Sequence, residues 1–212
     1  ISSVLLRVPV CRISAGKFPN FQVIPGWAAQ MAKGGAITHE HFGPSAHNLQ
    51  AIKASGLAKI AVQIRDPRQT LISYCHVDWV IDLIPPERRA EISQRIDWVL
   101  DPYFGQMIQW ISDWADAEDR ADPDLEIRIN TFENFVADKG AFFQGLWEFF
   151  GMPLTLEMVS EVIGDISDPA IPTINFRRGE TDEWRRVVTP AQAQAMWDLI
   201  PADLALRFGW RV

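Results

Sequence analysis

The sequence predicts an α/β fold in which helices flank a central parallel sheet. The first observation is an apolar run, Ile60–Ile64, that ends in the charged turn Arg65-Asp66-Pro67. A short apolar run closed by a turn is typical of a buried parallel strand. The second observation is Leu125–Ile129, whose alternating apolar and charged residues indicate another strand. The third is the helical spacing of apolar residues between these strands, as in Ile92–Val99.

Helices are expected where apolar residues recur at helical spacing or where capping residues stand. In chain order the expected ranges are 28–33, 46–55, 67–80, 86–99, 105–117, 141–150, 156–163 and 190–200. Gly56 and Gly151 follow two of these ranges, in the position that glycine prefers after a helix. Thr189 and Pro190 open the last range as N-cap and first helical residue. Residues 34–39 are expected to form a turn and a short strand, and the proline-rich residues 164–175 a loop.

Length and charge limit the function classes. The 212 residues, 48% of them hydrophobic, suit a single domain over residues 1–212 with a substantial core. A net charge of −7 argues against a general binder of nucleic acid or of anionic membranes. Basic character is local instead, because fifteen arginines stand against five lysines and several are paired in sequence.

The cysteines and the first residues bear on the compartment. Cys11 and Cys75 are far apart and belong to no zinc-binding pattern, so neither a disulfide framework nor structural zinc is expected. Free thiols favour the reducing cytoplasm. The apolar stretch Ile1–Val10 is too short for a membrane span and lacks the features of a signal peptide.

The turn after the first predicted strand is a candidate anion site. Open α/β sheets bind their ligands at the carboxyl ends of strands. Arg65 can bind a phosphate through two nitrogens, and Ser73, about two helical turns further on, adds a hydroxyl. The alternative is an ordinary strand–loop–helix connection whose arginines are solvated or paired with Asp66.

A second candidate anion site stands near the C-terminus at Arg177-Arg178-Gly179. Two arginines before a glycine suit an anion, since glycine lets a backbone N–H approach a phosphate closely. Trp184 follows seven residues after Arg177.

With both motifs in view, the chain resembles the sulfotransferases that use 3′-phosphoadenosine 5′-phosphosulfate (PAPS). Arg65-Asp66-Pro67 with Ser73 is similar to the 3′-phosphate motif of that family, and Arg177-Arg178-Gly179 with Trp184 to its Arg-Lys-Gly loop and the tryptophan after it. The resemblance implies a P-loop-type sheet and a 3′-phosphate held by Arg65, Ser73, Arg177, Arg178 and Gly179. It implies that Trp184 packs under the loop.

The resemblance extends to two further segments. Phe132 stands where the family has a tyrosine that contacts adenine, so its ring is expected to stack on the base without the hydroxyl. The family's phosphosulfate loop and its lysine are expected upstream of Ile1, which makes the chain truncated at its N-terminus. Ile1–Leu6 then resembles the helix that follows this loop.

The acceptor side is expected at residues 37–44. Thr38-His39 matches part of the family's Lys-Thr-His-Leu-Pro segment, while Ile37 replaces the lysine. Histidine suits a general base, because its ordinary pKa of about 6.5 lets it accept a proton near neutral pH. His39 is the first candidate for this base, and His41 and Glu40 are the others. The His-x-His pair has no third ligand at suitable spacing, so no metal is expected.

The resemblance predicts transfer of a sulfuryl group from PAPS to a hydroxyl or amine of a small-molecule or carbohydrate acceptor, giving 3′,5′-ADP. One alternative is a small-molecule kinase of P-loop type, although the sequence shows neither a Walker lysine nor a clear Mg²⁺ carboxylate. The other is an inactive nucleotide-binding relative, which the changes at Ile37 and Phe132 keep open. The oligomeric state also stays open, because three of the four positions of the family's dimer motif that were compared differ here.

Overall fold

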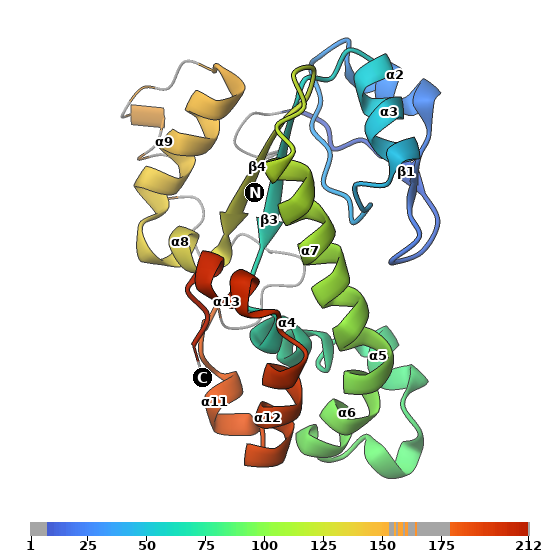
Figure 1. The fold of residues 1–212 in the computed structure, drawn as a ribbon, viewed down its shortest axis with the longest axis vertical. Coiled ribbons are helices and arrows are strands. Elements are labelled where there is room, and N and C mark those ends of the chain that lie inside the picture. Colours follow the sequence, from blue (N-terminus) through green and yellow to red (C-terminus); the bar gives the residue numbers. More distant parts are fainter. Residues whose placement is uncertain are drawn as a thin grey trace. The chain divides into compact units, whose positions relative to one another are not determined.

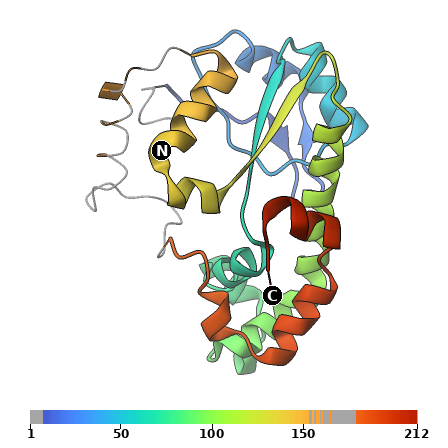
Figure 2. The same ribbon diagram turned by 60° about the vertical axis from the view of Figure 1, so that its left-hand side comes forward.

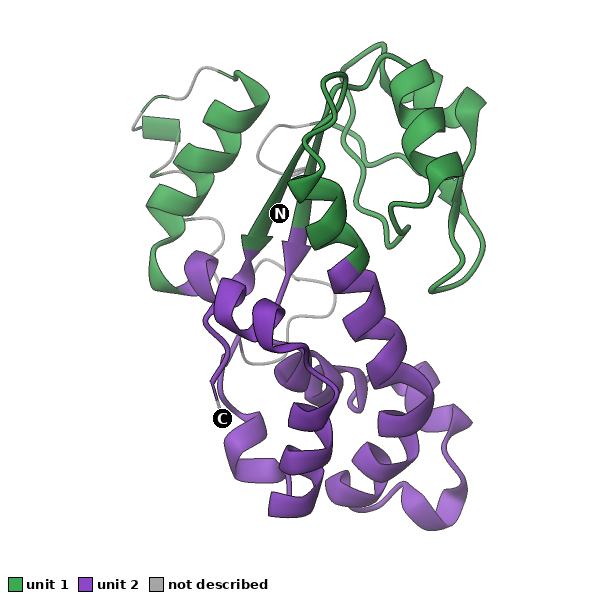
Figure 3. Ribbon diagram, viewed as in Figure 1, with its two compact units in different colours: residues 1–62, 113–130, 137–173 green, residues 63–112, 131–136, 174–212 purple. Residues whose placement is uncertain are grey.

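The structure is a computed structural model that describes residues 8–152 and 179–211, together with Thr155, Glu157, Met158, Ser160 and Gly164. It divides into two compact units (Figure 3). Unit 1 comprises Ile1–Val62, Asp113–Asn130 and Ala137–Thr173, and unit 2 comprises Gln63–Ser112, Thr131–Val136 and Ile174–Val212. A single domain over residues 1–212 stays a prediction. The helix expected at 1–6, most of that at 156–163 and nearly all of the loop expected at 164–175 lie outside the described residues.

Unit 1 begins with a small antiparallel ribbon and two helices. Strand β1 (Ser14–Ala15) pairs with β2 (Gln22–Val23), with Ser14 opposite Val23. Helix α2 (Pro25–Met31) starts at a proline, and α3 (Ala46–Ala54) starts after Ser45, whose hydroxyl accepts a hydrogen bond from the N–H of Asn48. In place of the short strand expected before His39, the structure has an isolated parallel bridge between Val10 and Ile37.

The predicted parallel strand pair is present. Strand β3 (Lys59–Ile64) is the hydrogen-bonded neighbour of β4 (Glu126–Thr131). The two strands run side by side in the same direction (Figures 1 and 2). Val62 and Ile64 of β3 are buried, whereas Lys59 and Gln63 are exposed. The strand is therefore less fully covered in the described structure than an apolar run predicts.

Helix α9 (Lys139–Phe150) has a different buried face from the expected one. It begins after Asp138, whose carboxylate accepts the N–H of Ala141, and ends at Gly151 with φ of 68°. The sequence suggested that Phe142, Leu146, Phe149 and Phe150 face inward. Phe149 is buried as expected, but the other buried residues are Phe143 and Trp147. Phe142 and Leu146 are half-buried, and Phe150 is 40% exposed. Phe143 and Trp147, one turn apart, pack edge to face at 5.4 Å between ring centroids.

The expected helix over residues 67–80 is wrong, because the chain breaks into two helices. Helix α4 (Pro67–Tyr74) ends before Cys75, and α5 (Asp78–Leu83) begins after Val77. Val77 is extended, with φ of −81° and ψ of 126°, which no continuous helix permits. The buried apolar residues on both sides of the break hide it from a spacing argument.

The expected helix over residues 86–99 is also divided. A single 3-10 turn, η1 (Pro86–Arg88), is followed by α6 (Ile92–Val99), because Glu91 is extended. A π-helical segment, η2 (Leu100–Phe104), then leads into α7 (Gly105–Asp119).

The C-terminal segment of unit 2 contains three helices. These are α11 (Trp184–Val187), α12 (Pro190–Asp198) and α13 (Ala202–Phe208). Helix α12 has the predicted N-cap Thr189, completed into a capping box by Gln192. Helix α13 was not predicted, although Gly209 after it has φ of 70°. Among the described residues, no helix has the length and apolar character needed to cross a membrane.

Candidate functional site

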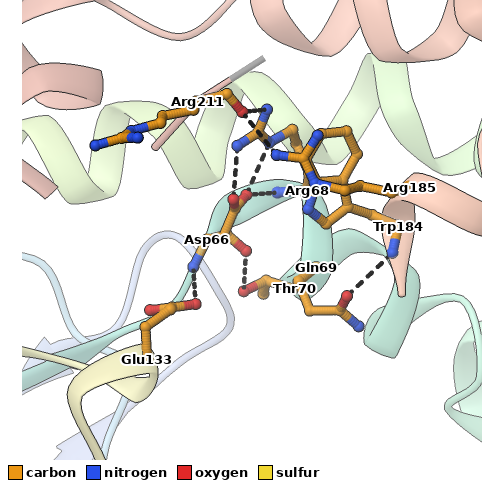
Figure 4. Close-up of polar contacts among 8 residues, drawn as sticks. All are labelled: Asp66, Arg68, Gln69, Thr70, Glu133, Trp184, Arg185 and Arg211. Carbon is orange, nitrogen blue, oxygen red and sulfur yellow. Dashed lines mark hydrogen bonds and ion pairs between the residues drawn. The ribbon is translucent and has the colours of Figure 1, made fainter. Parts of the chain in front are cut away.

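The end of β3 passes into α4 through a buried ion pair. Asp66 is the N-cap of α4, and its carboxylate accepts the N–H of Arg68 at 2.9 Å. The same carboxylate accepts Nε and Nη2 of Arg68 at 3.0 and 2.7 Å (Figure 4). Arg68 is only 2% exposed. Its charge is therefore matched inside unit 2, in the way that buried arginines require.

Arg68 also holds the C-terminal segment. Its Nη1 donates to the backbone carbonyl of Arg211 at 2.7 Å, and its guanidinium lies 3.9 Å from the ring centroid of Trp184. All three side-chain nitrogens of Arg68 donate to Asp66 or Arg211, so the role of Arg68 is structural (Figure 4). The structural alternative proposed for the arginines of this turn thus describes Arg68.

Arg65 has a different set of contacts. Its Nη1 donates to the hydroxyl of Ser73 at 3.2 Å, and its Nη2 donates to the backbone carbonyl of Glu180. Its guanidinium lies 4.4 Å from the ring centroid of Phe132. Arg65 is partly exposed, unlike Arg68. The structure thus brings together three residues that the sequence singled out, Arg65, Ser73 and Phe132, although they come from separate elements.

The predicted glycine loop reaches Arg65 through the next residue along the chain. Gly179 has φ of 68°, a left-handed conformation that glycine adopts at no steric cost. Glu180, whose carbonyl accepts from Arg65, forms an ion pair with Arg186 through its carboxylate. Arg177 and Arg178 lie outside the described residues, so their predicted contribution is not described here.

Trp184 lies in the interior of unit 2. It is 5% exposed, and the guanidinium groups of Arg68 and Arg185 lie 3.9 and 4.4 Å from its ring centroid. Its backbone N–H donates to Oε1 of Gln69 at 3.1 Å (Figure 4). Nε2 of Gln69 donates to Glu183 at 3.2 Å. Gln69 is fully buried and ties the start of α11 to α4. Sequence reasoning missed Gln69, although a polar residue in the first turn after a buried strand was a signal.

Glu133 is a second residue that sequence reasoning missed as part of this site. It follows Phe132 in α8 (Phe132–Ala137), and its Oε1 accepts the backbone N–H of Asp66 at 3.0 Å (Figure 4). Burial raises the pKa of the Glu133 carboxyl, while the hydrogen bond from Asp66 and the charge of Arg65 act in the opposite direction. Its contact with Asp66 crosses 67 residues of chain, so local sequence does not reveal it.

The predicted acceptor segment lies in unit 1. Both carboxylate oxygens of Glu40 bind the start of β1 and the residue before it: Oε1 accepts the N–H of Ile13 at 2.9 Å, and Oε2 accepts the hydroxyl of Ser14 at 2.8 Å. These contacts give Glu40 a structural role in holding the segment. His39 and His41, on either side of it, are exposed.

The pKa of His41 lies below the ordinary histidine value. Desolvation of its imidazole lowers the pKa, the nearby His39 lowers it further, and Glu40 acts in the opposite direction. A lowered pKa favours the neutral imidazole, which is the form that accepts a proton. In the part of the chain that the structure describes, no three histidine, cysteine or acidic side chains form a group suited to a metal ion.

For two tryptophans, Trp27 and Trp79, the sequence favoured burial in the core over a place in an acceptor pocket, but both are exposed. Trp27 is 47% exposed and Trp79 is 57% exposed. Trp79 contacts the edge of Tyr74, with ring centroids 5.5 Å apart, and Tyr74 stacks on Tyr103 at 3.9 Å.

Comparison with known proteins agrees with the motifs. No protein-family model matches the chain. The chain is 26% identical over 175 residues to sulfotransferase 6B1 of Danio rerio, covering 74% of this chain and 56% of that protein. Its structure is similar to the crystal structure of mouse sulfotransferase SULT7A1 complexed with PAP, with a TM-score of 0.59 and 18% identity over 77% of this chain and 63% of the other.

The two comparisons bear on different properties. The chain spans 56% and 63% of the lengths of these two relatives. The structural likeness shows a shared α/β fold, which confirms the predicted fold class. The sequence match adds a relationship that the fold alone does not carry. Together they agree with the resemblance that the motifs predicted, since the chain is similar to one sulfotransferase in sequence and to another in fold.

Proposed function

We propose that this chain is part of a sulfotransferase that moves a sulfuryl group from PAPS to a hydroxyl or amine of a small-molecule or carbohydrate acceptor and releases 3′,5′-ADP. The observation that carries the proposal is the convergence on Arg65. Ser73 of α4, Phe132 after β4 and the segment after Gly179 all meet its guanidinium. A partly exposed guanidinium at the end of a parallel strand, with a hydroxyl beside it, suits the recognition of a phosphate.

The 3′-phosphate is assigned to this convergence. Arg65 offers a planar set of donors, and Ser73, whose oxygen already accepts from Arg65, has its own proton to donate to a phosphate oxygen. The left-handed backbone at Gly179 lets a backbone N–H approach closely. Arg177 and Arg178 are assigned to the same phosphate on the strength of the motif alone.

The adenine is assigned to Phe132. The guanidinium of Arg65 covers one face of its ring, and an aromatic ring has a second face on which a base can stack. Trp184 is assigned an indirect role, because it is buried between Gln69, Arg68 and Arg185 rather than exposed. It supports the segment that carries Gly179 and Glu180.

The acceptor is assigned to the segment around His39 and His41. PAPS supplies the sulfuryl group, so the protein has to orient the acceptor and remove its proton. His39 takes the proton that the acceptor oxygen loses as this oxygen bonds to sulfur and the bond from sulfur to the phosphate oxygen breaks. His41 is the alternative base, and its lowered pKa suits that role at neutral pH. Glu40 is the weaker candidate, since its two oxygens accept hydrogen bonds from Ile13 and Ser14.

Two further parts of the proposal rest on the sequence. The cytoplasm is the proposed compartment, and no metal is proposed for the reaction. The competing functions are a small-molecule kinase and an inactive relative that binds nucleotide.

A binding experiment tests the proposal directly. At a concentration of about a hundred times its Kd, 3′,5′-ADP should stabilise the chain by about 2.7 kcal/mol, seen as a rise in melting temperature. Binding of 5′-AMP should be much weaker, because it lacks the 3′-phosphate that Arg65 would hold. Equal shifts from the two nucleotides would contradict the assignment. A shift that needs ATP and Mg²⁺ would favour the kinase, and binding without sulfuryl transfer by the whole protein would favour the inactive relative.

A further inference from the structure

We propose that Glu133 is a positioning residue that fixes the Arg65–Asp66 turn for phosphate recognition, a role that rests on the proposed nucleotide site. Glu133 is not assigned a contact with the nucleotide. It acts through the backbone of Asp66, whose N–H donates to Oε1 of Glu133 at 3.0 Å. The carboxylate thereby holds the residue next to Arg65 from across the end of β4.

The need for Glu133 follows from how α4 is capped. Asp66 is the N-cap, and in a capping box a Glu or Gln at the third helical position accepts the N–H of the N-cap residue. That position in α4 is Gln69, but the Gln69 amide donates to Glu183 and accepts from Trp184. The N–H of the buried Asp66 is therefore satisfied from another element, and Glu133 is the residue that satisfies it.

The consecutive residues Phe132 and Glu133 thus hold the consecutive residues Arg65 and Asp66. The ring of Phe132 lies under the guanidinium of Arg65, and the carboxylate of Glu133 accepts the N–H of Asp66. From its other side, Asp66 is held through its own carboxylate by Arg68 (Figure 4). The peptide between Arg65 and Asp66 has little freedom to rotate while these contacts last.

The consequence for binding is preorganisation. A guanidinium whose backbone is already fixed loses less conformational entropy when it binds a phosphate. Without the acceptor of Glu133, the buried N–H of Asp66 would lack a partner, and such groups are costly to leave unsatisfied. The turn would then shift to find one, and Arg65 would shift with it. The effect should fall on 3′-phosphate recognition and spare nucleotides that lack this group.

The experiment measures Kd by calorimetry for 3′,5′-ADP and for 5′-AMP with the whole chain and three variants. Glu133→Gln keeps an acceptor oxygen at the same reach but removes the charge. Glu133→Asp keeps the charge but is one methylene shorter, and Glu133→Ala removes both. We expect Glu133→Gln to bind 3′,5′-ADP within about threefold of the unmodified chain, and the other two about tenfold more weakly, a change equivalent to about 1.4 kcal/mol. Binding of 5′-AMP should be unchanged throughout.

The outcomes separate positioning from stability. A purely structural role would lower the melting temperature of a variant without changing the ratio of the two Kd values. If folded Glu133→Asp keeps that ratio, or if Glu133→Gln loses it, the positioning role is overturned while the proposed function stands. If the unmodified chain itself does not prefer 3′,5′-ADP, both fail. Should Glu133→Ala not fold, the comparison of Gln with Asp still decides.

Discussion

The replacement of Arg65 by alanine is the most direct perturbation of the proposed site. In the structure the guanidinium donates to Ser73 and to the carbonyl of Glu180, and it packs on Phe132. Arg65 is partly exposed and is not part of the buried pair between Asp66 and Arg68. Arg65→Ala should therefore still fold, but it loses the guanidinium that is proposed to bind the 3′-phosphate.

The expected loss of affinity for 3′,5′-ADP follows from the type of contact that Arg65 would make with the phosphate. A hydrogen bond to a charged group contributes about 1.5–3 kcal/mol, and each 1.4 kcal/mol is a factor of ten in Kd. Arg65→Ala should therefore weaken 3′,5′-ADP binding by about 10- to 150-fold. Arg65→Lys keeps the charge but cannot reproduce the planar pair of donors that reach Ser73 and Glu180, so it should restore only part of the affinity.

Calorimetric titration of 3′,5′-ADP measures this change, and the matched control is Arg88→Ala. Arg88 is an exposed arginine of η1 in the same unit, so its removal changes the net charge equally without touching the site. The control should bind like the unmodified chain. If folded Arg65→Ala also binds like the unmodified chain, the guanidinium does not hold the phosphate and the turn is an ordinary connection.

Further predictions concern other residues. Arg68→Ala should cost about 3–5 kcal/mol of unfolding free energy in urea, because it leaves Asp66 buried and unpaired. Replacement of the exposed Arg185 by alanine should cost under about 1 kcal/mol of unfolding free energy. Equal losses in the two variants would contradict the distinction between the buried Arg68 and the exposed Arg185. NMR titration of His41 should give a midpoint below the ordinary histidine value, and His39→Asn should raise it. Between the lowered pKa of the folded chain and the ordinary pKa of the unfolded chain, the unfolded chain binds more protons at His41 than the folded chain does. The contribution of His41 to the free energy of unfolding should therefore decrease as the pH falls through this range. A midpoint at or above the ordinary value would contradict both statements. Burial raises the pKa of Cys75 to about 12, so at pH 8 a thiol reagent should modify the half-buried Cys11 and leave Cys75 untouched until the chain unfolds. In the whole protein, His39→Ala should lower turnover by about 10²–10⁴-fold with little change in nucleotide affinity, and unchanged turnover would direct attention to His41.

The elements that the sequence predicted well carry their own boundary signals. Helix α4 begins where predicted, because Asp66 caps it and Pro67 suits its first position. Helix α12 begins where predicted for the same kind of reason, with Thr189 and Gln192 in a capping box. The spacing of eight residues between Arg65 and Ser73 led to the prediction that both reach one phosphate, and the hydrogen bond between them shows that only one turn and a short helix separate the two side chains. In each case the determining contacts lie within one or two helical turns.

The features that the sequence did not predict depend on contacts over long stretches of chain. The break at residues 75–77 has buried apolar residues on both sides, Leu71 and Ile72 in α4 and Val80 in α5, so the apolar spacing does not reveal it. Glu40 binds Ser14 and Ile13 across 26 and 27 residues of chain, and this structural role could not be predicted from the neighbouring sequence. Helix α13 was missed although Gly209 follows it, which shows that a helix signal went unused.

The same distinction explains why the roles of Arg65 and Arg68 could not be assigned from sequence. The two residues have the same type of side chain, stand in the same turn and lie near the same acid, Asp66. Composition and spacing therefore do not distinguish them. They differ in their distant partners: Arg68 donates to the carbonyl of Arg211, whereas Arg65 donates to the carbonyl of Glu180. Each of these carbonyls is more than a hundred residues away along the chain. The buried pair with Arg68 fixes the carboxylate of Asp66 at the start of α4. It thereby holds the turn that carries Arg65, which makes the structural role of one arginine a condition for the proposed function of the other.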